Sequence, residues 1–100
     1  MRRRTGKSAL ADYGLAGQGM TLYYVYILVS DLDPARHYTG RTKDLLHRID
    51  KHNAGEVPHT AKYRPWRLET YVAFTHESKA ITFERYLKSG SGREFARRHF

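Results

Sequence analysis

The chain has no cysteine among its 100 residues, which excludes disulfide bonds and thiolate zinc sites. Its six histidines show none of the paired spacings, such as HExxH or HxxxH, that place two metal ligands on one helical face. A structural metal is therefore not expected. The core must be held by packing, and a hydrophobic content of 40% over this length supports one compact domain.

Long apolar runs are missing as well. No stretch approaches the roughly 20 apolar residues that a membrane-spanning helix needs, and no basic helix has a wide exposed apolar face. The chain begins with the basic run MRRR, as a signal peptide does, but no apolar segment follows it. The sequence predicts a cytoplasmic protein with no membrane partner.

Acidic residues are scarce relative to basic ones. Lys and Arg total 18 against 10 Asp and Glu, and the net charge is +8. Such an excess favours a polyanionic partner, because each phosphate that a cation neutralises releases counterions. Nucleic acid is the partner class that this charge favours, and a merely soluble basic surface is the alternative that charge alone leaves open.

The first 20 residues are rich in Arg, Gly, Ser and Ala and show no hydrophobic period. We interpret residues 1–20 as a flexible N-terminal arm and residues 21–100 as the folded domain. Met20 directly precedes the first strand pattern, so residues 1–19 are open to being an addition to the native chain.

Three segments predict β-strands. Residues 21–30, TLYYVYILVS, carry β-branched and aromatic side chains on both alternating faces, as a central strand covered on both sides does. Residues 37–41 predict a second strand that forms an antiparallel hairpin with the first and ends at Gly40. Residues 66–75 alternate as a third strand, whose inward face is predicted to carry Leu68, Thr70, Val72 and Phe74.

A first helix is predicted up to about Asn53, with Thr42 or Asp44 as its cap and Gly55 as its stop. Its core stripe is formed by Leu45, Leu46 and Ile49, with Arg48 and His52 along the flank and Asn53 within the same arc.

A second helix is predicted over residues 79–89, capped by Ser78. Gly90-Ser91-Gly92 is expected to break it before a short final helix over residues 93–100. The predicted order is ββαβαα. This pattern places the domain in the α/β (α+β) class, as a three-stranded antiparallel sheet flanked by helices.

Glu84 stands out, because it falls in the middle of the buried face that the apolar residues of the second helix define. A carboxylate there is costly unless a cation or donor lies nearby. One interpretation is a salt bridge to a neighbour such as Arg48, or a side chain that reaches solvent at the edge. The other is a metal ligand, because one carboxylate with waters and phosphate oxygens is a common way to hold Mg²⁺.

Tyr26 and Tyr38, in the two hairpin strands, are candidate functional phenols, although strand tyrosines are usually packing residues. Arg48 has the chemistry to bind phosphate oxygens and to stabilise charge in phosphoryl transfer, and solvated helical arginines are common. His52 and Asn53 are equally well interpreted as supporting donors or as a polar helix end.

Basic side chains recur on the predicted helices and in the loop beside Tyr63 and Trp66. A solvated face is one interpretation of them, and a DNA-backbone patch is the one that the overall charge favours. The candidates for nucleic-acid binding are Arg41, Lys43, Arg64, Lys88 and Arg93.

Taken together, these residues resemble the GIY-YIG endonuclease superfamily, in particular its small single-domain bacterial members. Tyr24-Val25-Tyr26 matches the GIY element and Tyr38-Thr39-Gly40 the YIG element, while Arg48, His52 and Glu84 match the helical arginine, the following histidine and the metal-binding glutamate. Two departures are Tyr24 for the first glycine and Thr39 for the central isoleucine. The resemblance covers residues 23 to 100 and implies the GIY-YIG nuclease fold.

The resemblance further implies a metal-dependent endonuclease that hydrolyses DNA phosphodiester bonds by a one-metal mechanism. Glu84 would hold one divalent ion, Mg²⁺ or Mn²⁺, Tyr38 or Tyr26 would take a proton from water, and Arg48 would stabilise the phosphate, assisted by Lys43 or His52. Larger relatives carry an additional DNA-recognition domain that this chain lacks. That difference suggests weak cutting, branched or single-stranded DNA substrates, or a protein partner.

Two other functions remain as alternatives at this point. The first is a non-catalytic nucleic-acid-binding module on the same scaffold, which would bind DNA in a salt-sensitive way without cutting it. The second is a protein-interaction adaptor, which the strongly basic charge disfavours.

Overall fold

The computed structural model describes residues 20–100. The predicted N-terminal arm, apart from Met20, and the question of whether residues 1–19 are native lie outside the described residues. In chain order the elements are β1 (Tyr23–Ser30), β2 (His37–Thr42), α2 (Leu45–Asn53), the short 3-10 helix η1 (Ala61–Tyr63), β3 (Trp66–Phe74), α3 (Glu77–Leu87) and α4 (Gly90–His99). The predicted order ββαβαα is confirmed.

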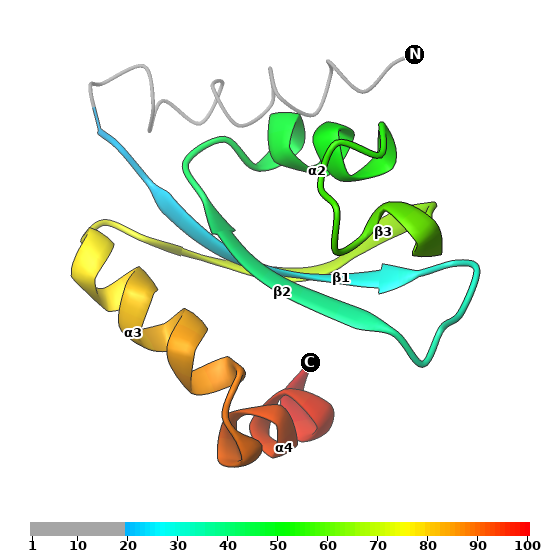
Figure 1. Cartoon of the computed structure of the whole chain (residues 1–100). Helices are drawn as coiled ribbons and strands as arrows, with labels where there is room; N and C mark the ends of the chain where they lie inside the picture. The colour runs from blue at the N-terminus through cyan, green and yellow to red at the C-terminus, as the bar shows by residue number, and fades with distance from the viewer. Residues whose placement is uncertain (1–19) are drawn as a thin grey trace.

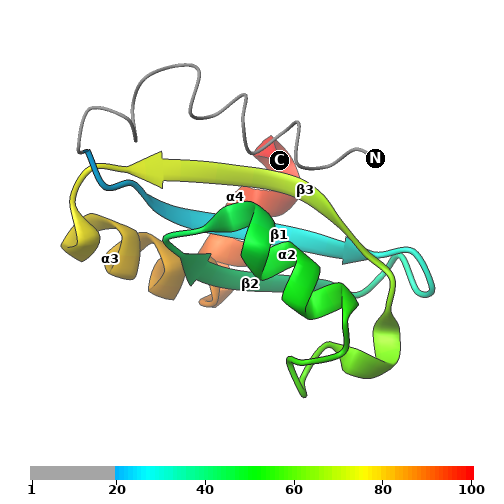
Figure 2. The ribbon, with the colours of Figure 1, turned by 90° about the horizontal axis from the view of Figure 1, so that it is seen from above.

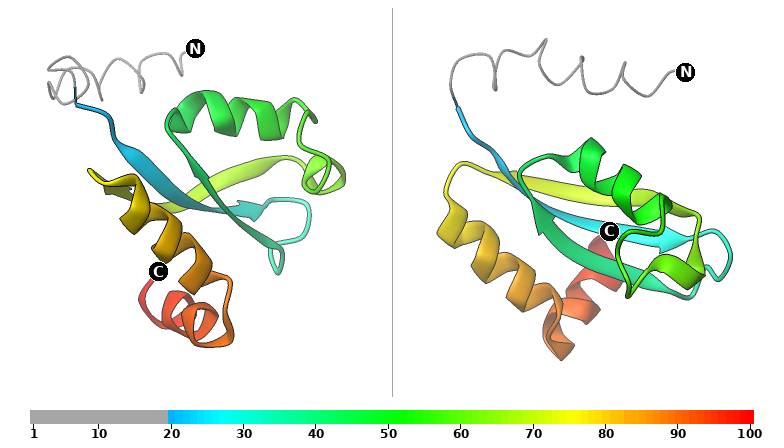
Figure 3. Two further views of the ribbon diagram at one scale, coloured as in Figure 1. Left: turned by 60° about the vertical axis from the view of Figure 1, so that its left-hand side comes forward. Right: turned by 45° about the horizontal axis from the view of Figure 1, so that its top comes forward.

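The sheet has three antiparallel strands in the order β2-β1-β3, so β1 is central as predicted. Helix α2 lies on one face of the sheet, and α3 and α4 lie on the other (Figures 1 and 3). The predicted α+β class, with a three-stranded sheet flanked by helices, is confirmed. None of the helices described within residues 20–100 is long and apolar enough to cross a membrane.

The alternation of β1 supplies both faces with apolar side chains. The α2-side core consists of Tyr24, Tyr26, Leu28, Leu45 and Trp66. The α3-side core consists of Val25, Ile27, Ala80 and Leu87. Viewed from above, α2 lies across the sheet on the face where the α2-side core is found (Figure 2). A strand with two buried faces explains why its sequence is apolar at nearly every position.

Strand β3 contains a bulge that its sequence pattern did not indicate. Ile27 and Leu28 are neighbours on β1, but their partners on β3 are Thr70 and Leu68, so Glu69 is skipped. Leu68 therefore packs on the α2-side core, whereas the end of β3 packs on the α3-side core. The prediction that the apolar residues of this strand share one face is wrong for Leu68, because a bulge reverses the alternation.

Among the predicted helix ends, one cap is confirmed and two starting positions differ. Asp44, one of the two predicted caps, accepts a hydrogen bond from the His47 backbone N–H at 3.3 Å. Helix α3 begins after His76 instead of Ser78. Helix α4 already starts at Gly90, because the Ser89 hydroxyl accepts from the Gly92 N–H at 3.1 Å and caps it.

Gly40 does not end β2, as was predicted, but lies buried inside it. A Cβ atom at this position would lie 2.5 Å from the Tyr26 hydroxyl oxygen and 2.9 Å from a ring carbon of Tyr38. The absence of a side chain at position 40 is what gives the Tyr26 ring its place over β2. Gly40 is therefore a packing requirement of the α2-side core.

Replacing Gly40 by alanine is expected to lower the free energy of unfolding by about 2 kcal/mol, the usual cost of overpacking a well-filled core. Tyr26 is 1% exposed and cannot move aside easily. The matched control is Gly90→Ala, because a Cβ at Gly90 meets no atom within 4 Å. Urea unfolding of both variants measures the difference, and equal midpoints would contradict this account of Gly40.

Candidate active site

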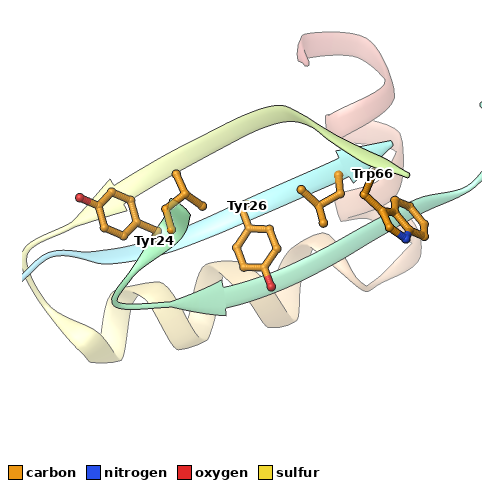
Figure 4. Close-up of a cluster of buried hydrophobic side chains, with 5 residues drawn as sticks. Tyr24, Tyr26 and Trp66 are labelled. Atoms are coloured by element: carbon orange, nitrogen blue, oxygen red, sulfur yellow. The ribbon is translucent and has the colours of Figure 1, made fainter. Parts of the chain in front are cut away.

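Tyr26 lies in the middle of β1 on the α2 side of the sheet and is only 1% exposed. Its ring is packed in the α2-side core with its oxygen directed across β2, whereas the oxygen of Tyr24 points elsewhere (Figure 4). Its hydroxyl lies 2.9 Å from His52 Nε2, and Arg48 Nε donates to the same oxygen at 3.4 Å. The structure thus brings together three of the predicted site residues, from β1 and from one flank of α2.

The hydrogen bonds around His52 fix the direction of each proton. Thr60 Oγ1 donates to the Val57 carbonyl at 3.2 Å, so it accepts from His52 Nδ1 at 2.8 Å. A neutral imidazole that donates through Nδ1 must accept at Nε2. The Tyr26 hydroxyl therefore donates its proton to His52 Nε2 and keeps its lone pairs for the Arg48 N–H.

His52 is a fully buried neutral base. Burial, together with the nearby positive charge of Arg48, lowers the pKa of His52 from 6.5 to about 4. Between these pH values the unfolded chain binds more protons than the folded chain, so stability falls as the pH falls through this window.

We expect the free energy of unfolding to drop by about 2 kcal/mol between about pH 7 and about pH 5 because of this one group. Urea unfolding at several pH values measures the drop, and NMR titration of the His52 ring measures the pKa directly. His52→Gln should flatten the dependence, whereas His59→Gln, at an exposed position, should leave it intact. An equally steep dependence in His52→Gln would show that another group is responsible.

Arg48 is hydrogen-bonded to Tyr26, one of the two candidate phenols. Its hydrogen bond to Tyr26 raises the pKa of the guanidinium, in spite of partial burial, and the electrostatic influence of Tyr38 adds to the rise. The Tyr38 ring lies 4.8 Å from the His52 ring and 6.2 Å from the Tyr26 ring, between centroids. Arg48 therefore remains cationic, with its side chain held at Tyr26 by a hydrogen bond.

Tyr26 is held in its neutral form. Burial raises its pKa, the hydrogen bond from Arg48 opposes this, and the negative charge of Glu84 adds to the rise. Because Tyr26 is buried and already donates to His52, its hydroxyl positions Arg48 more readily than it takes a proton from water.

Glu84, on α3, is paired with two cations. Its Oε1 accepts from Arg41 Nε at 3.1 Å and its Oε2 accepts from Lys88 Nζ at 3.0 Å. The predicted alternative of a salt bridge to Arg48 is wrong in its partner, because Arg41 on β2 points to the α3 side. The Glu84 side chain retains 18% of its exposure, so the pairing is not sealed from solvent.

The site groups come from both faces of the sheet and meet at the edge strand β2. Tyr26 and Arg48 belong to the α2 side, whereas Arg41 and Glu84 belong to the α3 side. Strand β2 carries Arg41 on the α3 side and Gly40 on the α2 side, where a Cβ would collide with Tyr26.

The donor set fits a magnesium ion held by few protein ligands. Within residues 20–100 no group of three or more His, Asp or Glu side chains is close enough to hold a metal. A metal here would depend on Glu84 together with waters and phosphate oxygens, which is how Mg²⁺ commonly binds at phosphoryl-transfer sites. Each Glu84 oxygen makes one ion pair and has a further lone pair for a metal.

Asn53, one of the two α2 residues with alternative interpretations, is structural. Its side chain donates to the Trp66 carbonyl at 2.9 Å and accepts from the Trp66 N–H at 2.7 Å, which ties the end of α2 to the start of β3. His52, by contrast, lies in the site. These contacts separate two neighbouring residues that the sequence could not distinguish.

The predicted nucleic-acid-binding residues do not form one patch. Arg41 and Lys88 flank Glu84, whereas Lys43 lies over the Tyr23 ring at 5.7 Å from its centroid. Arg64 donates to the Ala61 carbonyl at 2.6 Å in the loop after α2. Arg93, on α4, lines a cavity on the α3 side of the sheet.

The comparison with protein families gives a direct match. A family model described as the GIY-YIG catalytic domain matches residues 22–97. The chain belongs to the GIY-YIG family. The match runs from the start of β1 into α4, so the resemblance found in the sequence and the fold it implied are confirmed.

Two curated proteins are similar to this GIY-YIG domain. It is 35% identical over 71 residues to the structure-specific endonuclease subunit SLX1 homolog of Giardia intestinalis, covering 67% of this chain and 20% of that protein. It is 33% identical over 67 residues to a UPF0213 protein of Haloquadratum walsbyi, covering 66% of this chain and 75% of that protein. The chain thus spans about a fifth of the Giardia protein. No solved structure matches it at the same level of significance.

Thr60 is the site residue of this GIY-YIG domain that sequence reasoning missed. It is 1% exposed, sets the tautomer of His52, and accepts a hydrogen bond at its carbonyl from Trp66 Nε1 at 2.8 Å. It lies in a loop without hydrophobic period, where a threonine carries no signal. Its role becomes visible in the folded structure, where this loop packs against α2 and brings Thr60 to His52.

Proposed function

We propose that this chain is a metal-dependent endonuclease that hydrolyses phosphodiester bonds of DNA, with one divalent ion, Mg²⁺ or Mn²⁺, held by Glu84. The observation that carries the proposal is the hydrogen-bonded set of Arg48, Tyr26 and His52 beside strand β2, whose Arg41 pairs with Glu84. Membership of the GIY-YIG family and the printed name of the Giardia relative support a nuclease.

In the proposed reaction, a water oxygen attacks phosphorus and the bond to the leaving sugar oxygen breaks. The Tyr38 oxygen takes the proton of the attacking water as its own phenolic proton passes to solvent, and the leaving sugar oxygen takes up a proton from water. Tyr38 is the phenol chosen for this role because Tyr26 is buried and already donates to His52. Arg48 stabilises the negative charge that builds on the phosphate oxygens, and Tyr26 and His52 hold Arg48 in place. A bound Mg²⁺ would supply charge neutralisation at the phosphate and at the leaving oxygen.

The substrate that we propose is DNA with a branch or a single-stranded segment. The Giardia relative is named a subunit of a structure-specific endonuclease, and its printed name supports both a branched substrate and a protein partner. The net charge of +8 supports attraction to the DNA backbone.

The two phenols give a prediction that separates their roles. Tyr38→Phe is expected to lower the cleavage rate about a hundredfold, the typical contribution of a general base, with little loss of stability. Tyr26→Phe removes the hydrogen bonds to His52 and Arg48, so it should also lower the free energy of unfolding by about 1–2 kcal/mol. Rates and urea midpoints of both variants test this, and a Tyr38→Phe protein that cuts normally would move the base to another group.

The experiment that tests the proposed function is a cleavage panel with and without Mg²⁺. The substrates are duplex, flap, junction and single-stranded DNA of one sequence. Metal-dependent cutting of at least one of them, lost in chelator, is expected. Salt-sensitive binding without cutting of any substrate would instead identify the chain as a non-catalytic nucleic-acid-binding module.

A further inference from the structure

The α3 side of the sheet carries a cavity of about 580 Å³ that the proposed chemistry does not use. Helix α4 packs mainly against α3, and the cavity lies between it and the sheet. This volume is in the range of small-ligand pockets. Its apolar wall is formed by Ile27, Leu87, Ala96 and Phe100.

The other wall of the cavity is cationic. Lys88, Arg93 and Arg97 all line it from the two helices. Lys88 and Arg97 also pair with Glu84 and Glu94, whereas Arg93 forms no ion pair with any residue from 20 to 100. Arg93 is therefore the cation that is most available to an anion in the cavity.

The sheet wall contributes one acidic group, Glu69, the bulge residue of β3. It pairs with His37 of β2, with 3.4 Å between Oε1 and Nε2. Its charge would repel a phosphate from the sheet side, so a phosphate in the cavity is directed to the helix side. The cavity therefore has an apolar part suited to a flat ring and a basic part suited to a phosphate.

Lys88 connects this cavity with the candidate active site, because it lines the cavity and pairs with Glu84. Tyr38 borders the cavity from β2, but its ring lies on the other face of the sheet, beside the His52 ring. A DNA strand whose phosphate lay over β2 would thus have its neighbouring nucleotide at the cavity mouth.

We propose that this cavity binds one unpaired nucleotide of a DNA strand adjacent to the cleavage position, with its base against the apolar wall and its phosphate at Arg93. The inference rests on the proposed function, because that function is what would bring DNA to this edge of the sheet. A paired base cannot enter, so occupation of the cavity selects DNA with a single-stranded segment beside the cut. Stacking on an aromatic side chain, here Phe100, is the usual way in which proteins hold unpaired bases.

The test measures binding in EDTA, where no metal-dependent cutting occurs. A labelled oligothymidylate and an abasic strand of equal length are titrated with the wild-type protein and followed by fluorescence anisotropy. Arg93→Glu should weaken oligothymidylate binding about tenfold, whereas Arg98→Glu, a matched change on α4 outside the cavity, should weaken it less than about threefold. Arg93→Gln removes the positive charge without adding a negative one, and it should also weaken oligothymidylate binding more than Arg98→Glu does.

The contribution of the base is measured separately. Phe100→Ala should weaken binding of the oligothymidylate about fivefold or more and leave the abasic strand unchanged. Equal effects of Arg93→Glu and Arg98→Glu, or equal wild-type affinities for the two strands, would overturn the proposal. Cleavage is assayed apart from this with Mg²⁺, so a protein that cuts DNA but fails these binding tests keeps its nuclease function and loses only the nucleotide pocket.

Discussion

Glu84→Gln is expected to lower metal-dependent DNA cleavage about a thousandfold or more, because it removes the negative charge that would hold the metal ion. The amide has the shape of the carboxylate, so the packing around α3 is retained. The ion pairs with Arg41 and Lys88 involve side chains that are 34% and 53% exposed, so their loss should cost about 1 kcal/mol or less. Cleavage rates at several Mg²⁺ concentrations measure the effect.

Glu77→Gln is the matched control for this variant. Glu77 lies on the same helix and pairs with the same arginine, with 3.6 Å between its Oε2 and Arg41 Nη1, but it is half exposed. Its loss should leave the cleavage rate within about twofold of wild type, as expected of a surface ion pair. A Glu84→Gln protein that cuts DNA at the rate of Glu77→Gln would refute the metal role of Glu84.

Arg48→Lys is expected to lower the cleavage rate about a hundredfold or more while keeping the positive charge. The guanidinium donates to Tyr26 through Nε and presents its remaining N–H groups in a fixed plane, which suits two phosphate oxygens at once. A lysine ammonium on a flexible stem cannot make both contacts. Single-turnover rates with saturating protein separate this loss from weaker DNA binding.

The control for Arg48 is Lys51→Ala on the same helix. Lys51 pairs with Glu56 at 3.9 Å, so its removal changes the net charge of α2 without touching the tyrosines. A small reduction in DNA affinity and a nearly unchanged rate are expected for it. If Arg48→Lys and Lys51→Ala reduced the rate equally, the effect would be one of general charge.

The fold could be predicted because each helix and strand has a recognisable hydrophobic periodicity in the sequence. Both faces of β1 are apolar, which alone required helices on both sides of the sheet. The predicted residues Tyr26, Arg48 and His52 come together because β1 and the flank of α2 face each other across the α2-side core. Local pattern and tertiary structure agree at these positions.

Other features depend on contacts between segments that are distant in sequence. The partner of Glu84 is Arg41, because the register of β2 against β1 places residue 41 opposite Val25, on the α3 side. The bulge at Glu69 and the role of Thr60 follow from strand pairing and from the path of a loop. The hydrophobic periodicity of the sequence does not indicate any of these features.

The candidate active site is complete only in the fully folded domain, because its residues come from both helical layers and meet at strand β2. A chain in which α2 had docked but α3 had not would hold Arg48 beside Tyr26 and lack the carboxylate. A chain with only α3 docked would hold Glu84 and Arg41 without the guanidinium of α2. Under the proposed function, a partly folded molecule would lack one half of the site, and DNA cleavage would require both helical layers to be packed on the sheet.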